Sequence, residues 1–148
     1  MVIPDGSYSV SDFVILKALY GCTEIDMSGF NTSTWFNDLS NGGNTLPYLK
    51  TFILNTEENT SETKKFSSSA FSELFTLTSN GKQMPLFPNL ENLYICNTVL
   101  YEKDASSRFG ELDLSQFSKL KVINAIGTDA DILLPNSSSL TTLKLQSP

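Results

Sequence analysis

Apolar residues recur along this 148-residue chain with one spacing pattern, which is clearest at residues 86–98. There Phe87, Leu90, Leu93 and Ile95 stand three, three and two residues apart. Spacing by threes indicates a turn, and spacing by two predicts a short strand whose alternate side chains face a core. Because the unit repeats along the chain, the pattern predicts a solenoid of stacked strands.

Four other stretches carry the same apolar offsets. Residues 14–29 align without a gap on residues 112–127, and five apolar positions agree over these sixteen residues. The pattern returns at 46–54 and again at 140–145. We therefore expect five units whose core positions are Leu16, Leu19, Cys22, Ile25 and Met27; Leu46, Leu49, Phe52 and Leu54; Phe87, Leu90, Leu93 and Ile95; Leu114, Phe117, Leu120, Ile123 and Ala125; and Leu140, Leu143 and Leu145.

The connections between the units carry other signals. Residues 32–42 and 67–81 each combine a Ser or Thr cap, apolar residues one turn apart and a closing glycine, which predicts two short helices. The polar residues 57–65 are expected to form a surface loop. Near the N-terminus, Ser11 and the apolar run that ends at Gly21 fit a helix, whereas Val10, Phe13 and Ile15 fit a strand. The β-branched and aromatic residues at 13–15 favour the strand.

The units at 90–98 and 140–145 resemble a known repeat family. Leu90-x-x-Leu93-x-Ile95-x-x-Thr98 and Leu140-x-x-Leu143-x-Leu145 are similar to the L-x-x-L-x-L-x-x-N core of leucine-rich repeats. The resemblance implies an α/β fold, a leucine-rich-repeat solenoid with a parallel β-sheet on the concave face and with loops and one or two short helices on the convex side.

The sequence departs from the regular family in two respects. Thr98 and Thr128 stand where the family has Asn, so we expect their hydroxyl groups to bond nearby backbone more weakly. The steps between units, 27, 41, 30 and 20 residues, are uneven. The Asn-, Ser- and Thr-rich composition is similar to irregular repeat proteins of gut Bacteroidetes and the phages that infect them, which implies a cell-surface, extracellular or virion location.

Residues 1–148 are expected to form a single solenoid domain. The last unit at 140–145 is followed by only three residues, and terminal repeats normally carry a polar outer face. We therefore expect the chain to be a fragment of a longer repeat protein that continues into further repeats.

The residues between the core positions of each strand would face the concave side and form the candidate binding surface. Strands about 4.8 Å apart would place Ile53 beside Tyr94, with Ile126 one strand further on, as an apolar strip in a polar field. A solvated sheet face without a partner explains the same pattern equally well. The candidate binding residues are Ile53, Asn55, Asn92, Tyr94, Asn124, Ile126 and Lys144.

Charge and composition bear on the class of function. The net charge is −6 and the ten Lys and Arg residues are scattered, which argues against nucleic acid. Absence of an apolar run near 18 residues argues against membrane insertion. Histidine is absent, and neither Cys22 nor Cys96 has a second ligand nearby, so we expect no cofactor and no metal. Cys22 would lie in the core and Cys96 on the concave face, too far apart for a disulfide.

Three functional hypotheses remain open from the sequence. The first is a non-catalytic binding or scaffold module for a protein or glycan partner. The second is a purely structural spacer or assembly segment. The third is a glycan hydrolase that uses Glu24 and Asp26, two carboxylates on the same side of one strand.

Overall fold

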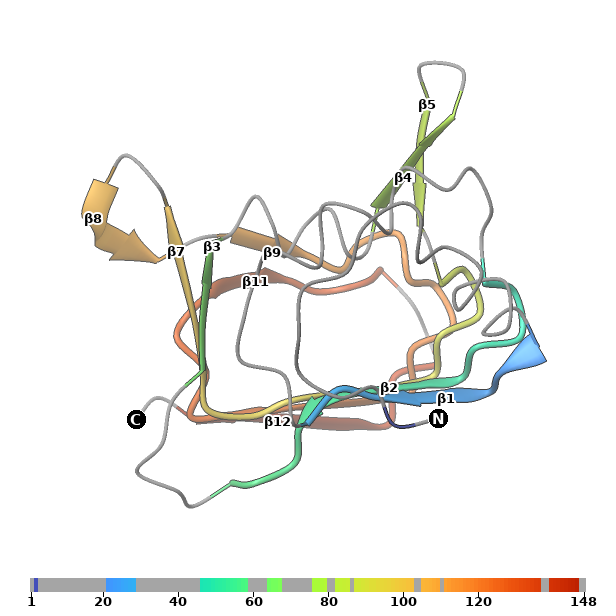
Figure 1. The fold of residues 1–148 in the computed structure, drawn as a ribbon, viewed down its shortest axis with the longest axis horizontal. Helices are drawn as coiled ribbons and strands as arrows, with labels where there is room; N and C mark the ends of the chain where they lie inside the picture. The colour runs from blue at the N-terminus through green and yellow to red at the C-terminus, as the bar shows by residue number, and fades with distance from the viewer. Residues whose placement is uncertain are drawn as a thin grey trace.

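The computed structural model describes Val2 and residues 21–28, 46–58, 64–67, 76–79, 82–85, 87–102, 105–109, 111–136 and 139–146 (Figure 1). Within these residues the secondary structure is almost entirely β. The strands are β1 (Glu24–Asp26), β2 (Thr51–Asn55), β3 (Lys64–Ser67), β4 (Thr76–Ser79), β5 (Lys82–Pro85), β6 (Asn92–Ile95), β7 (Thr98–Glu102), β8 (Ala105–Phe109), β9 (Glu111–Asp113), β10 (Val122–Ile126), β11 (Asp131–Leu133) and β12 (Thr142–Gln146).

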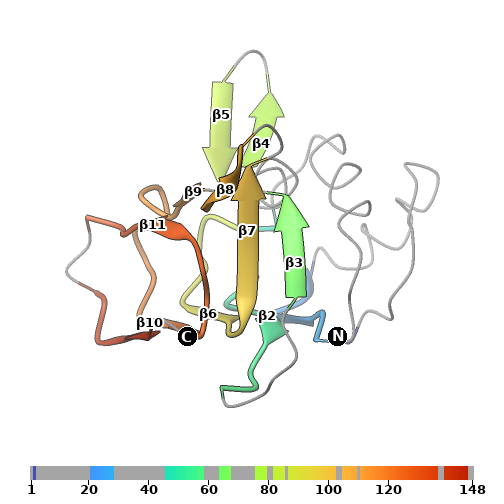
Figure 2. The ribbon, with the colours of Figure 1, turned by 90° about the vertical axis from the view of Figure 1, so that its left-hand side faces the viewer.

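One five-stranded parallel sheet contains a strand from each predicted unit. Its order is β1-β2-β6-β10-β12, and every neighbouring pair is parallel. The predicted parallel sheet is therefore confirmed, as are the positions of its five strands. In Figures 1 and 2 this sheet forms one wall of the molecule, and the parallel pair β9–β11 lies across the core from it.

The turns before the sheet strands repeat the same backbone contacts. The carbonyl of Thr23 accepts from the N–H groups of both Lys50 and Thr51, at 2.8 and 3.0 Å. The carbonyls of Lys50, Glu91 and Lys121 each accept two N–H groups from the next unit in the same way. Residues three apart in the turns are also linked, since Leu90 N–H bonds the Phe87 carbonyl at 3.1 Å. The spacing by threes thus corresponds to a real turn.

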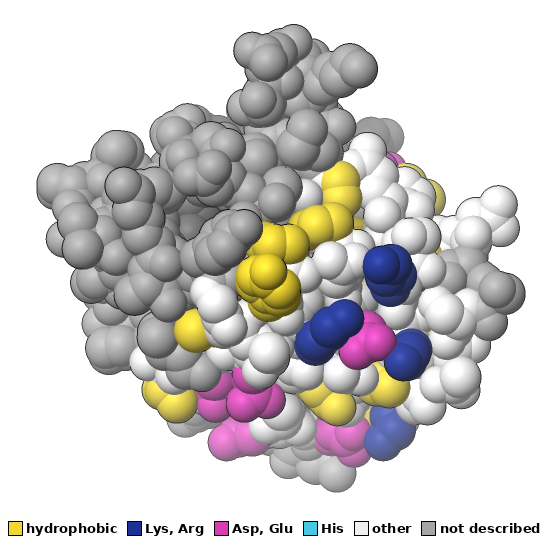
Figure 3. All heavy atoms as spheres, turned by 90° about the vertical axis from the view of Figure 1, so that its right-hand side faces the viewer, with side chains coloured by type: hydrophobic (Ala, Val, Ile, Leu, Met, Phe, Trp, Pro, Cys, Tyr) yellow, Lys and Arg dark blue, Asp and Glu magenta, His cyan; other side chains and the backbone are white. Residues whose placement is uncertain are grey.

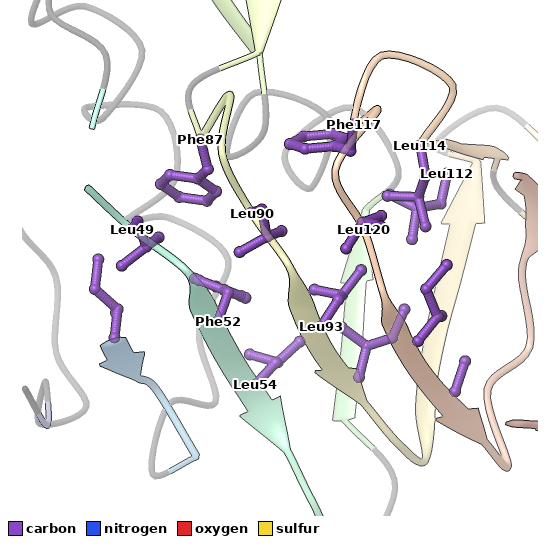
Figure 4. Close-up of a cluster of buried hydrophobic side chains, with 14 of the residues drawn as sticks. Leu49, Phe52, Leu54, Phe87, Leu90, Leu93, Leu112, Leu114, Phe117 and Leu120 are labelled. Carbon is purple, nitrogen blue, oxygen red and sulfur yellow. The ribbon is translucent and has the colours of Figure 1, made fainter. Parts of the chain in front are cut away.

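Apart from Leu112, the buried apolar residues of the core stand at positions that the repeating pattern predicts. Alternate residues of a strand point to one face, so the paired positions Phe52 and Leu54 both face inward and are fully buried. Phe52 also stacks on Phe87, with ring centroids 5.5 Å apart. Figure 4 shows ten of the buried side chains lying against one another: Leu49, Phe52, Leu54, Phe87, Leu90, Leu93, Leu112, Leu114, Phe117 and Leu120.

The first and last units differ from this regular core. Leu16 and Leu19 lie outside the described residues, whereas Ile25 and Met27 of the same unit are buried. In the last unit Leu143 and Leu145 keep 41% and 50% of their surface exposed, because β12 is the edge strand of the sheet. Their positions match the pattern, and their burial does not.

The helix predictions are partly tested. No α-helix lies among the described residues, and the helix predicted at 32–42 falls outside them. Within the helix predicted at 67–81, Thr76–Ser79 is strand β4, paired antiparallel with β5, so this part of the prediction is wrong; residues 68–75 are not described. Asn80-Gly81 stands between the two strands in the sequence, and this dipeptide is the strongest short-range hairpin signal. The hairpin therefore takes the place of the predicted helix end.

The other connections also differ from expectation. Lys64 and Lys65, predicted to lie in a loop, belong to β3, and β3 pairs parallel with β7. This pairing joins residues that are more than thirty positions apart in the sequence. It satisfies backbone N–H and C=O groups that would face solvent in a loop. Residues 10–15 lie outside the described chain, although Val2 forms a parallel bridge with Asp26 at the edge of β1.

Candidate functional site on the outer face of the sheet

The outer face is the face of the five-stranded sheet opposite the core. Strand register arranges its side chains in two rows that cross all five strands. The first row is Glu24, Thr51, Asn92, Val122 and Thr142. The second, which we call the central row, is Asp26, Ile53, Tyr94, Asn124 and Lys144.

The apolar strip predicted on this face is shorter than expected. Ile53 and Tyr94 are direct neighbours in register, which confirms the first part of the prediction. The next position after Tyr94 is Asn124, and Ile126 lies two residues further along β10 opposite Gln146. Ile126 therefore lies on the next strand, as expected, but diagonally offset from Tyr94 and out of line with the Ile53–Tyr94 pair. The central row places one apolar and one aromatic side chain between polar ends.

Asn55 lies in a different environment from the one predicted. The register between β2 and β6 shifts after Ile53, so that Asn55 pairs with Ile95. Such a bulge changes which side of the strand a residue faces. Asn55 is only 7% exposed, and its Oδ1 accepts the N–H of Glu57 at 3.1 Å. It forms the turn that leaves β2 and does not face a partner on the outer face.

Asn92 and Asn124 remain on the outer face but are engaged within the protein. Asn92 Nδ2 donates to Thr51 Oγ1 on the neighbouring strand at 3.1 Å. Asn124 is buried, and its Nδ2 donates to Glu58 Oε1 at 2.7 Å. The two amides fix the positions of their neighbours, and Lys144 is the exposed end of the row.

Glu58 is a residue of this site that the sequence did not reveal. It follows β2, yet its carboxylate contacts Asn124 and also accepts from Lys144 Nζ at 3.3 Å, 66 and 86 residues away. Asn97 holds the preceding residue, because its Nδ2 donates to the carbonyl of Glu57. No local pattern marks Glu58, which stands in a polar segment. The contact depends on the order of the strands.

The hydrogen bond from Asn124, and after it the hydrogen bond from Lys144, lowers the pKa of Glu58 below its ordinary value of 4.5. A carboxyl whose folded pKa is lowered stabilises the fold above the unfolded value, and the contribution disappears as pH falls through the folded pKa. We expect Glu58→Gln to lower the melting temperature at about pH 7, and the difference from the parent protein to shrink as pH falls below 4.5 and through the lowered pKa of Glu58. Thermal melts across this pH range measure it.

Glu57→Gln is the matched control for that experiment. Glu57 is exposed and contacts Asn55 and Asn97 through its backbone, so the substitution preserves both hydrogen bonds. We expect it to leave the melting temperature at about pH 7 unchanged. A difference between Glu58→Gln and the parent that persists undiminished at low pH contradicts the assignment.

Cys96 also differs from its prediction. The sequence pattern places it on the concave face, but it is fully buried, with its Sγ 3.7 Å from the Asn124 carbonyl. Cys96 is not among the residues of the hydrophobic core and is influenced by the Glu58 and Lys144 charges of the outer face, so the structure contradicts its exposure and not the side of the sheet predicted for it. Burial raises the pKa of the Cys96 thiol, and the nearby Glu58 charge acts in the same direction. Cys22 packs partly buried against the core, and the two cysteines form no disulfide.

The two carboxylates of the hydrolase hypothesis lie at the first edge of the sheet. Glu24 is exposed, and Asp26 is partly buried. Asp26 Oδ1 accepts the N–H of Ser28 at 2.8 Å, a turn contact that any strand end can use. Within the described residues, no group of three side chains has the geometry of a metal site, and no helix is long and apolar enough to cross a membrane.

A second polar cluster lies beside the turns that precede the sheet strands. Figure 3 shows basic side chains close to acidic ones on this side of the molecule. Lys121 Nζ lies 2.9 Å from Glu91 Oε1, and this contact lowers the pKa of Glu91. Lys119 Nζ donates to Asn89 Oδ1 at 2.7 Å, and Asn89 donates to the Pro47 carbonyl at 2.7 Å. These side-chain contacts link consecutive turns.

Comparison of the chain with family models, with curated proteins and with solved structures gives no match.

Proposed function

We propose that the chain is a leucine-rich-repeat type solenoid that acts as a non-catalytic binding module for a protein or glycan. Support for the solenoid comes from the repeated unit itself. At each of the four contacts between successive units, one backbone carbonyl accepts two N–H groups from the next unit. Each unit also carries its apolar residues at the same offsets. Stacks of this kind present an extended sheet on which a partner can lie.

The central row carries the binding proposal. Ile53 and Tyr94 lie side by side on a sheet face whose ends are Asp26 and Lys144. An aromatic ring with a polar hydroxyl, partly buried among polar neighbours, suits both stacking against a sugar ring and contact with a protein. A peptide or glycan chain laid across the strands would meet apolar surface in the middle and charges at the ends.

Replacement of Tyr94 by alanine is expected to weaken partner binding at least tenfold, because an aromatic anchor at the centre of an interface contributes more than about 1.4 kcal/mol. A glycan array and a pull-down identify the partner, and calorimetric titration then gives the affinity of each variant. Circular dichroism establishes that the variants are folded.

Tyr48→Ala is the matched control, because Tyr48 is an exposed tyrosine in the turn before β2, away from the central row. We expect its affinity to stay within about twofold of the parent protein. Equal losses at Tyr48 and Tyr94 contradict a site on the outer face.

A structural assembly segment is the second candidate function. The observation that favours it is the exposure of Leu143 and Leu145 on the edge strand β12, where every earlier unit buries the same positions. An apolar sheet end of this kind is typical of a contact surface. The hydrolase hypothesis gains no further support from Glu24 and Asp26.

A further inference from the structure

The chain leaves β2 on the outer side of the five-stranded sheet, where residues 55–58 form a segment that we call the strap (Figures 1 and 2). The Asn55 carbonyl accepts the N–H of Cys96 at 3.0 Å, and the Asn55 side chain accepts the N–H of Glu57. The side chain of Asn97 donates to the Glu57 carbonyl. The strap is therefore bonded to the two residues that follow β6, Cys96 and Asn97.

Glu58 fastens the strap to two further strands. Its Oε1 accepts from Asn124 Nδ2 of β10 at 2.7 Å and from Lys144 Nζ of β12 at 3.3 Å. The Lys144 side chain is half exposed, and exposed ion pairs contribute little to stability. Asn124 is buried, and a hydrogen bond from a buried amide to a carboxylate is strengthened by the charge. The contact with Asn124 is therefore the stronger of the two.

Two residues of the outer face are buried where the strap lies. Asn124 belongs to the central row, and Cys96 follows Tyr94 by two positions, yet their exposed fractions are 6% and 0%. Ile53 and Tyr94, in the same row, stay partly exposed. The charge of Glu58 helps to raise the pKa of the Cys96 thiol, so the carboxylate lies near the sulfur. The strap thus shields one part of the outer face and leaves the apolar pair accessible.

We propose that the strap is a lid on the outer face, that the contact between Glu58 and Asn124 holds it closed, and that its opening exposes Asn124 and Cys96. All four residues of the strap are polar, so it opens by breaking a few hydrogen bonds without uncovering an apolar side chain of its own. Local openings of this kind cost much less free energy than global unfolding. The closed strap also occupies donors of Asn124 and Lys144 that a partner on the central row could use. This last consequence rests on the proposed binding function, whereas the lid itself does not.

The rate at which iodoacetamide alkylates Cys96 tests the proposal, measured by mass spectrometry in a Cys22→Ser background that leaves Cys96 as the one cysteine. We expect the folded protein to react at least about a hundredfold more slowly than the chain in denaturant, because a buried thiol reacts only when it is uncovered. Glu58→Ala removes the contact with Asn124 and is expected to raise the rate at least about tenfold. Asn97→Gly removes the hydrogen bond to the strap and is expected to raise the rate as well. Circular dichroism and thermal melts establish that the variants are folded.

Two control variants separate opening of the strap from other causes. Glu58→Gln removes the charge, which lowers the pKa of the Cys96 thiol, but its side-chain oxygen can still accept from Asn124. We expect it to raise the rate by less than about threefold. Glu91→Ala breaks the ion pair with Lys121 at the opposite end of β6 and is expected to react like the parent protein.

Three results overturn the proposal. The first is a folded protein whose Cys96 reacts as fast as in denaturant, since the strap then shields nothing. The second is an equal rate for Glu58→Ala and Glu58→Gln, because the charge alone then explains the effect. The third is an equal acceleration by Glu91→Ala, which would indicate general destabilisation. Because the assay contains no partner, these results leave the binding proposal to be decided separately by the Tyr94→Ala comparison.

Discussion

Replacement of Leu93 by alanine is expected to lower the free energy of unfolding by about 2–5 kcal/mol, the range for a buried leucine that leaves a cavity. Leu93 is fully buried in β6, the central strand of the five. Its neighbours in register are Phe52 and Ile123, both in the core, so the space left by the missing methyl groups has rigid walls. Chemical denaturation monitored by circular dichroism gives the change in the midpoint and in the free energy.

Leu143→Ala provides the matched comparison. Leu143 has the same position in its unit as Leu93, but 41% of its surface is exposed, so less apolar area returns to water. We expect a loss below about 1 kcal/mol. Equal losses at the two leucines would mean that the units do not stack in the observed register.

The sheet and its core could be predicted because each unit encodes them locally. Each unit has a turn with apolar residues three apart, followed by two apolar residues that are two apart. This spacing predicts both the position of a strand and the side of the strand that is buried. Ile25, Phe52, Leu93 and Ile123 follow from this rule, and all four are buried. Stacking order then follows chain order, since each unit can bury its apolar face only against the next.

The features that escaped prediction depend on geometry between units. The bulge that turns Asn55 inward is a mismatch between β2 and β6, visible only when the two strands are paired. Glu58 meets Asn124 and Lys144 because β2, β10 and β12 lie in one sheet. The wrong helix prediction at Thr76–Ser79 has a different cause. The apolar residues before these positions have a mixed spacing that fits a helix. A prediction based on that spacing overlooks the Asn80-Gly81 dipeptide, which signals a hairpin.

Replacement of Gly127 by alanine is expected to lower the free energy of unfolding by about 2–5 kcal/mol, the sum of left-handed backbone strain and a disrupted hydrogen bond. Gly127 has φ +75°, and a Cβ there would lie 2.0 Å from Asn97 Oδ1. Asn97 cannot move away freely, because its Nδ2 donates to the Glu57 carbonyl and its N–H bonds the Ile126 carbonyl at 2.9 Å. Chemical denaturation measures the loss.

Gly21→Ala is the control for glycine replacement as such. A Cβ at Gly21 meets nothing within 4 Å, and its backbone is outside the left-handed region. The substitution mainly reduces the conformational freedom of the unfolded chain, so we expect the free energy of unfolding to rise by between zero and about 1 kcal/mol. A loss at Gly21 as large as that at Gly127 would contradict the contact with Asn97 as the cause.

A double-mutant cycle separates the contact from the backbone strain. Asn97 has φ 47°, a conformation that glycine adopts readily, so Asn97→Gly removes the side chain that a Cβ at position 127 would strike, without straining the turn. In the Asn97→Gly background only the left-handed strain at position 127 remains, and we expect Gly127→Ala to cost about 1–2 kcal/mol there. The difference from the single substitution is the coupling between the two positions, expected at about 1–3 kcal/mol. If the losses are additive, backbone strain alone explains why position 127 requires glycine. The hydrogen bond from Asn97 to Glu57 then does not depend on the residue at position 127.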